Sequence, residues 1–158
     1  MAVKRYEGMF VVDSSKSGAE FPETVRLVAD ILQRHRADIE RIEKWGERKF
    51  AYPIKRSKRG IYILTYFQAE GSAIREIRED VSLNEDILRV LIILPEKISP
   101  VTGELYTPEG EELSEEETEA VAAAVAAELE EEAEEEEELV EEEEVEEVPA
   151  ETGAEEGA

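Results

Sequence analysis

The chain has 158 residues and a formal net charge of −24, with 18 Lys and Arg against 42 Asp and Glu. It has no cysteine, which excludes disulfides and thiolate metal sites. The N-terminus lacks the apolar segment of a signal peptide, and the longest strongly apolar run, Val90 to Pro95, is too short to span a bilayer. These features predict a soluble, cytoplasmic protein.

The charge is divided unevenly along the chain. All 18 Lys and Arg and 16 of the acidic residues lie in residues 1–98, which therefore carry a net charge of +2. The other 26 acidic residues are all glutamates in residues 99–158, where there is no cation. We predict a folded domain over residues 1–98, a linker rich in Pro and Gly over residues 99–110, and an Ala/Glu-rich tail over residues 111–158.

The first part of the domain predicts a strand, a helix and a long second strand. Residues 6–12 alternate in polarity as a half-buried strand does. Pro22 suits the first turn of a helix, and apolar residues follow it at helical spacing: Val25, Val28, Ile31 and Leu32. Residues 39–52 then predict a strand with a bulge at Gly46.

The second part predicts a hairpin, a helix and a last strand. The segment 53–59 between two apolar runs predicts a long loop rather than a tight turn. Gly71 marks the start of a helix that ends near Leu83. Residues 87–94 are almost all apolar, which predicts a strand buried between two neighbours. The order β-α-β-β-α-β predicts an α+β, ferredoxin-like (split βαβ) fold, with a four-stranded antiparallel sheet and both helices on one face.

The Ala/Glu-rich tail predicts disorder. Glutamates four residues apart repel one another on a helix, so the apolar stripe in this region supports at most a marginal helix: Leu113, Val121, Val125 and Leu129. We therefore predict a disordered, solvated acidic tail. A second hypothesis is that it folds back over the basic segment between Lys55 and Arg59.

Cations in the hairpin are the main candidates for RNA contact. Four of them occupy five positions at the tip, which suits binding to phosphates: Lys55, Arg56, Lys58 and Arg59. Lys4 and Arg5, before the first strand, fit RNA contact and simple solvation equally well. The same two interpretations stand level for Arg48, Lys49 and Arg89, which lie within strands.

The third predicted strand allows a test for single-stranded RNA recognition. Domains of that kind place aromatic residues at alternate positions, where they stack on bases. Here the corresponding positions hold Ile61 and Ile63, which cannot stack. These two residues predict core packing or, less strongly, contact with a partner protein. Trp45 is predicted to pack, and His35, which has no second His or Cys for a metal site, is predicted to lie on the surface.

Several segments resemble the family of bacterial ribosomal protein six of the small subunit. They are Tyr6-Glu7, the Gly-x-Arg-x-x-Ala-Tyr-Pro-Ile pattern within Gly46–Lys55, Gly60-Ile61-Tyr62 and Leu88-Arg89. The resemblance covers about residues 4–97 and departs at Phe50, where leucine is usual, and in the long acidic extension. It implies a structural protein that binds the central domain of small-subunit ribosomal RNA together with ribosomal protein eighteen. It implies no DNA, membrane or cofactor.

Other classes of function are weighed against this one. Catalysis has little support, because the chain lacks Cys, has one His without an evident Ser–Asp partnership, and has no phosphate-binding P-loop. One alternative is a ferredoxin-like regulatory domain that binds a small metabolite. Another is an acidic-tailed chaperone or histone-like adaptor. The weak charge of the domain argues against tight RNA binding by this chain alone and favours a basic companion protein.

Overall fold

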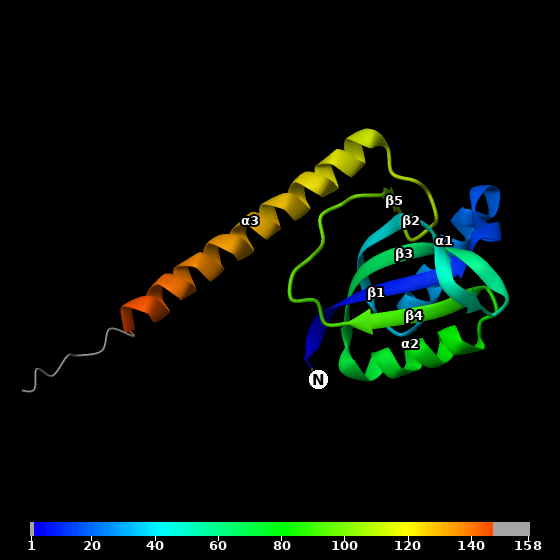
Figure 1. The fold of residues 1–158 in the computed structure, drawn as a ribbon, viewed down its shortest axis with the longest axis horizontal. Coiled ribbons are helices and arrows are strands. Elements are labelled where there is room, and N and C mark those ends of the chain that lie inside the picture. Colours follow the sequence, from blue (N-terminus) through cyan, green and yellow to red (C-terminus); the bar gives the residue numbers. More distant parts are fainter. Residues whose placement is uncertain (1, 147–158) are drawn as a thin grey trace, which may run out of the picture.

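The computed structural model describes residues 2–146, in which a five-stranded antiparallel sheet carries two helices on one face (Figure 1). The strands, in the order β4-β1-β3-β2-β5, are β1 (Val3–Asp13), β2 (Asp38–Ile54), β3 (Ser57–Glu70), β4 (Ile87–Ile93) and β5 (Glu104–Tyr106). The α-helices are α1 (Phe21–Arg34), α2 (Gly71–Leu83) and α3 (Glu115–Glu146). Two 3-10 turns, Ser14–Lys16 and Gly18–Glu20, lead into α1. The ferredoxin-like fold is confirmed, with one strand more than predicted.

The main core lies between the sheet and the helices α1 and α2. Alternate residues of β3 enter it, and Ile61 and Ile63 are fully buried there. Successive side chains of a strand point to opposite faces, so Tyr62, Leu64 and Tyr66 lie on the other face, which we call the open face. The prediction that Ile61 and Ile63 contact a partner is therefore wrong, because the two helices already cover them.

β4 is an edge strand, and the prediction that it lies between two neighbours is wrong. Its helix-side residues, Ile87 and Ile92, are buried in the core. On the open face Leu91 is 60% exposed and Ile93 is 43% exposed. The apolar run of β4 thus combines one buried face with one exposed face. Because both faces are mostly apolar, the sequence pattern of this edge strand resembles that of a central strand.

The β2–β3 hairpin closes in a two-residue turn rather than the predicted long loop. Lys55 and Arg56 have φ values of +44° and +72°, the left-handed conformation that a type I′ turn requires at both positions. Ile54 pairs with Ser57 next to the turn. The register then shifts between Ile54 and Lys49, so residues 50–53 form a bulge on β2. The cations of the predicted loop are consequently divided between the turn and the start of β3.

The segment predicted as a linker crosses the open face and adds the fifth strand. We call residues 98–103 the strap. Ile98 packs with Leu64 and Tyr66 of β3 in a second, smaller core. β5 then pairs with residues 42–44 of β2, and its central residue Leu105 is buried. The Pro and Gly content of a segment therefore does not exclude tertiary packing.

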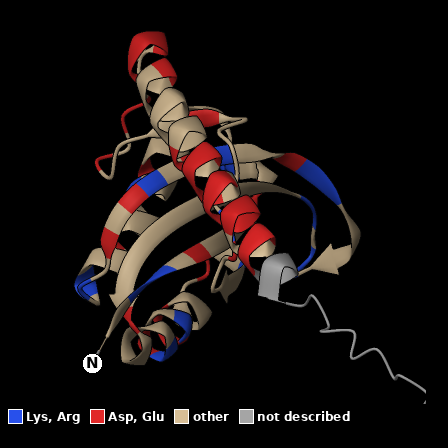
Figure 2. Ribbon diagram, turned by 90° about the vertical axis from the view of Figure 1, so that its left-hand side faces the viewer, with Lys and Arg blue, Asp and Glu red and all other residues tan. Residues whose placement is uncertain are grey.

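α3 is helical where disorder is predicted, so that prediction is wrong for residues 115–146 (Figure 2). Ser114 and Glu117 form a reciprocal capping box: the Ser114 hydroxyl and backbone N–H donate to Glu117 Oε2, and the Glu117 N–H donates to Ser114 Oγ. The hydrogen bonds from Ser114 lower the pKa of Glu117. The predicted apolar stripe is half-buried. Residues 147–158, also predicted to be disordered, lie outside the described residues.

Two ion pairs, one part-buried and one exposed, link α3 to the rest of the domain. Arg5 Nη1 lies 2.6 Å from Glu128 Oε1, and Lys97 Nζ lies 2.6 Å from Glu136 Oε2. The hypothesis of contact with the hairpin tip is not supported, because within the described part of the chain α3 forms no ion pair with residues 55–59. A cavity of about 270 Å³ lies between α3 and the open face, beside Arg41 and Tyr66.

Candidate nucleic-acid interface

The hairpin tip presents a dense group of exposed cations. The turn carries Lys55 and Arg56, and β3 begins with Lys58 and Arg59. Across the ladder, Lys49 of β2 pairs with Arg59. In the described part of the chain these five cations form one ion pair, in which Arg59 Nε lies 3.2 Å from Glu47 Oε1. Most of the positive charge at the tip is therefore available to a ligand.

The tip end of the hairpin is fastened to β1. Ser57 Oγ donates a hydrogen bond to Asp13 Oδ2, and this bond lowers the pKa of the Asp13 carboxyl. Gly60 of β3 leaves room for the Phe50 ring of β2, because a Cβ added at Gly60 would lie 2.2 Å from that ring. These contacts fix the direction in which the cationic tip projects.

Arg89 joins the hairpin, whereas Lys4 and Arg5 do not. Arg89 Nη1 of β4 donates a 3.0 Å hydrogen bond to the hydroxyl of Tyr52 in the bulge of β2. Arg5 lies near the opposite end of the sheet, where it pairs with Glu40 and Glu128 and the Glu128 bond raises the pKa of its guanidinium. Lys4 is exposed beside it. The structure thus groups Arg89 with the tip and separates the two N-terminal cations from it.

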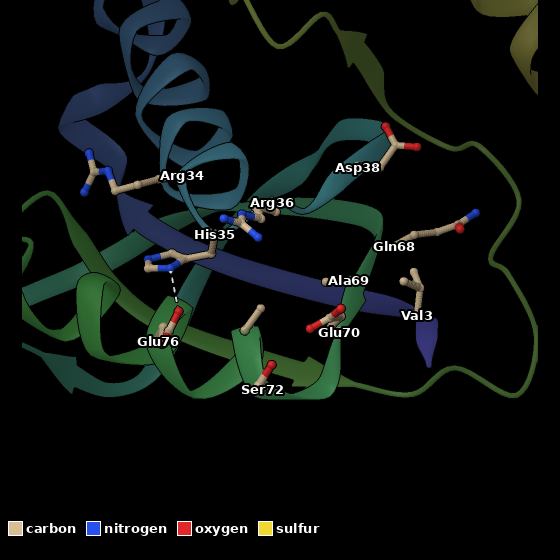
Figure 3. Close-up of a pocket in the computed structure, with 11 residues that line it drawn as sticks. Val3, Arg34, His35, Arg36, Asp38, Gln68, Ala69, Glu70, Ser72 and Glu76 are labelled. Atoms are coloured by element: carbon tan, nitrogen blue, oxygen red, sulfur yellow. Dashed lines mark hydrogen bonds and ion pairs between the residues drawn. The ribbon is translucent and has the colours of Figure 1, made fainter. Parts of the chain in front are cut away.

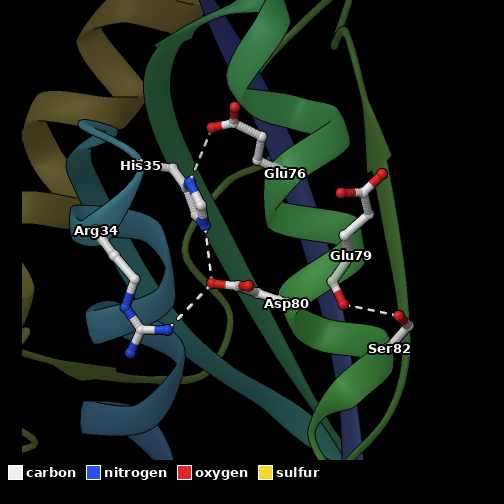
Figure 4. Close-up of polar contacts among 6 residues, drawn as sticks. All are labelled: Arg34, His35, Glu76, Glu79, Asp80 and Ser82. Carbon is white, nitrogen blue, oxygen red and sulfur yellow. Dashed lines mark hydrogen bonds and ion pairs between the residues drawn. The ribbon is translucent and has the colours of Figure 1, made fainter.

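A groove of about 610 Å³ lies between the end of α1 and the start of α2 (Figure 3). One of its lining residues, His35, is held by two acidic side chains of α2. His35 is only 15% exposed and lies 3.1 Å from Glu76 and 2.8 Å from Asp80, to which Arg34 also donates (Figure 4). His35 is thus half-buried rather than free in solvent, because its ring links the two helices.

The contacts of Asp80 predict a loss of stability in acid. The hydrogen bond from His35 lowers the pKa of Asp80 in the folded protein. The ionised Asp80 carboxylate therefore adds to the free energy of unfolding at pH values above the ordinary pKa of Asp. This stabilisation is lost as the pH falls through the lowered pKa of the folded protein. We expect Asp80→Asn to reduce the decline in unfolding free energy between about pH 5 and pH 2, measured by urea denaturation. Exposed Glu85, replaced by Gln, is the matched control, and an unchanged decline in Asp80→Asn would contradict the assignment.

Comparison with known proteins assigns the domain that carries this hairpin to a protein family. Residues 5–94 match the family described as "Ribosomal protein S6". This chain belongs to the ribosomal protein S6 family. Members are structural, non-enzymatic components of the bacterial small ribosomal subunit, so the protein is cytoplasmic and associated with ribosomes. The matched region ends before the strap.

Individual relatives agree with the family match. The small ribosomal subunit protein bS6 of Fusobacterium nucleatum is 33% identical over 91 residues, which cover 58% of this chain and 97% of that protein. The bS6 protein of Syntrophotalea carbinolica is 30% identical over 115 residues, covering 73% of this chain and all of that protein. The crystal structure of 30S ribosomal protein S6 from Thermotoga maritima has a TM-score of 0.53 and 28% identity, covering 58% of this chain and 87% of that chain.

The described residues contain no group of three or more His, Asp or Glu placed to hold a metal ion. No helix among them is long and apolar enough to cross a membrane. The hairpin end of the sheet combines exposed cations with the exposed ring of Tyr52 and the half-buried ring of Tyr62. Sequence reasoning missed Tyr52 and Tyr62 as candidates, although the Tyr next to the tip Pro in the family pattern was a usable signal.

Proposed function

We propose that this protein binds the central domain of small-subunit ribosomal RNA together with ribosomal protein eighteen, and that the hairpin tip supplies its phosphate contacts. The observation that carries the proposal is the group of exposed cations around a rigid two-residue turn: Lys49, Lys55, Arg56, Lys58 and Arg59. Cations on a projecting hairpin can neutralise the phosphates of an RNA backbone. Membership of the ribosomal protein S6 family supports the same proposal.

The distribution of charge supports the need for a companion protein. Residues 1–98 carry a net charge of only +2, and α3 adds a long acidic surface (Figure 2). Affinity for RNA rises with the number of phosphates that are neutralised, and acidic side chains near RNA reduce it. The companion would supply further cations, while this chain contributes the hairpin and a protein-binding surface.

We expect this protein alone to bind a central-domain RNA fragment weakly, and to bind it at least about tenfold more tightly when ribosomal protein eighteen is present. Gel-shift titrations at fixed salt with and without the partner measure the difference. An unrelated protein of similar size and positive charge replaces the partner in the control titration. Equal affinity in the two main titrations would show that partner dependence is wrong.

A further inference from the structure

The open face of the sheet is divided into a covered part and an uncovered part. The strap covers Leu64 and Tyr66, whose side chains are almost fully buried. The next row toward the hairpin consists of Arg89 of β4, Val11 of β1 and Tyr62 of β3, which are paired across the ladder. In this row Arg89 is exposed, Tyr62 is half-buried and Val11 is buried. The row lies between the strap and the cationic tip.

Two pairs of an exposed aromatic ring and an arginine lie beside the uncovered row. Trp45 of β2 is 41% exposed, and its ring lies 6.2 Å from the Tyr62 ring at an interplanar angle of 71°. The Arg48 guanidinium lies 5.3 Å from the centre of the Trp45 ring. At the other end Tyr52 is 59% exposed, and the Arg89 guanidinium lies 5.8 Å from the centre of its ring. The predicted packing role of Trp45 therefore accounts for only part of its surface.

We propose that these residues form a stacking platform for unpaired RNA bases: Trp45, Arg48, Tyr52, Tyr62 and Arg89. Aromatic rings and guanidinium planes both stack on bases, and neighbouring cations hold the phosphates that connect them. The inference rests on the proposed function in one respect, that the natural ligand is RNA. It adds a second mode of recognition, through bases, to the phosphate contacts of the tip.

Charge favours RNA over a protein as the ligand of this platform. The central part of a protein–protein interface is depleted of charged residues. Here each exposed ring is accompanied by an arginine, and the tip beside it carries Lys55 and Arg56. A sheet face with exposed aromatics is also how single-stranded RNA is bound by domains of the same topology. In this chain, strand parity places Tyr62, not Ile61, at the stacking position.

Trp45 is the only tryptophan in the chain, so its fluorescence reports on the platform alone. The probe is a short oligoadenylate at low salt, compared with an abasic oligonucleotide that has the same number of phosphates. We expect oligoadenylate to quench Trp45 fluorescence in the full-length protein and the abasic chain to leave it almost unchanged. Equal quenching by the two chains, or no quenching by either, would overturn the platform.

Variants separate stacking from charge. Tyr52→Leu should weaken oligoadenylate binding by about tenfold without changing the slope of log affinity against log salt, because stacking releases no counterions. Tyr52→Phe should keep most of the affinity, since it keeps the ring. Leu91→Ala, exposed on the same face, is the matched control and should bind normally. A Tyr52→Leu variant that binds normally, while its thermal unfolding matches that of the parent chain, also overturns the inference.

Failure of this inference is distinguishable from failure of the proposed function. If oligoadenylate does not quench Trp45 but the tip cations still set the salt dependence of central-domain RNA binding, the platform is wrong and the proposed function stands. If Trp45→Leu weakens binding to ribosomal protein eighteen in the absence of RNA and leaves oligoadenylate binding unchanged, the row is a protein contact, which also overturns the platform.

Discussion

Replacement of Lys55, Arg56, Lys58 and Arg59 by alanine is expected to weaken binding to central-domain RNA by more than about tenfold at low salt. The slope of log affinity against log salt should fall by about 0.9 for each phosphate contact that is lost. The melting temperature should barely change, because these side chains are exposed and the single Arg59–Glu47 pair in the described part of the chain lies at the surface.

The control must remove charge without touching the tip. A double variant at the turn, Lys55→Ala with Arg56→Ala, is compared with Arg34→Ala combined with Arg75→Ala, which removes two cations from the helices. Both doubles lower the net charge equally, so a general electrostatic effect would weaken them alike. We expect only the turn variant to change the salt slope. An unchanged slope in the quadruple variant would show that the tip does not contact phosphates.

The order β-α-β-β-α-β from β1 to β4 was predictable from the sequence because each of these elements has a strong local signal. α2 begins at Gly71 and ends at Leu83, both as predicted, since its end signals and apolar stripe agree. The turn of the hairpin was not predicted. The bulge at residues 50–53 makes the apolar pattern of β2 end early, and a Lys-Arg pair is an unusual sequence for a left-handed turn.

The open face was the least predictable part of the interface. A shift of one residue exchanges the two faces of a strand, and Ile61 and Ile63 lie on the face that the helices cover, whereas Tyr62 lies on the open face. Strand parity depends on which side the helices pack, and that is a property of the whole fold. The grouping of Arg89 with Tyr52 depends on the sheet order, because β4 follows β2 by more than thirty residues in the chain.

The C-terminal region contained a signal that composition obscured. Ser114 followed by Glu117 is a capping box, and it marks the start of α3 despite the acidic sequence after it. The strap has no such local signal. Its conformation depends on hydrogen bonds to Arg41 and Glu43 of β2, which are about sixty residues away in the chain. Composition describes what a segment can do alone and does not report the contacts that the rest of the chain offers it.

Glu43 is the residue that holds the strap. It is fully buried on the open face, and its Oε1 accepts hydrogen bonds from the backbone N–H groups of Thr102 at 2.9 Å and Gly103 at 2.7 Å. Its Oε2 lies 3.4 Å from Arg41 Nη2, which donates a 2.9 Å bond to the carbonyl of Ser99. One buried ion pair therefore binds both ends of the strap.

Glu43→Ala is expected to destabilise the protein by about 3–5 kcal/mol, because it leaves Arg41 buried without its counter-ion and removes the acceptor of two strap N–H groups. Urea denaturation measures the free energy of unfolding, and hydrogen exchange should show the amides of Thr102 and Gly103 losing protection before those of the central strand β3. The double variant Arg41→Met with Glu43→Leu should recover much of the loss, since it leaves no unpaired charge. A Glu43→Ala variant as stable as the parent chain, with the strap still protected, would show that the pair does not hold this segment to the sheet.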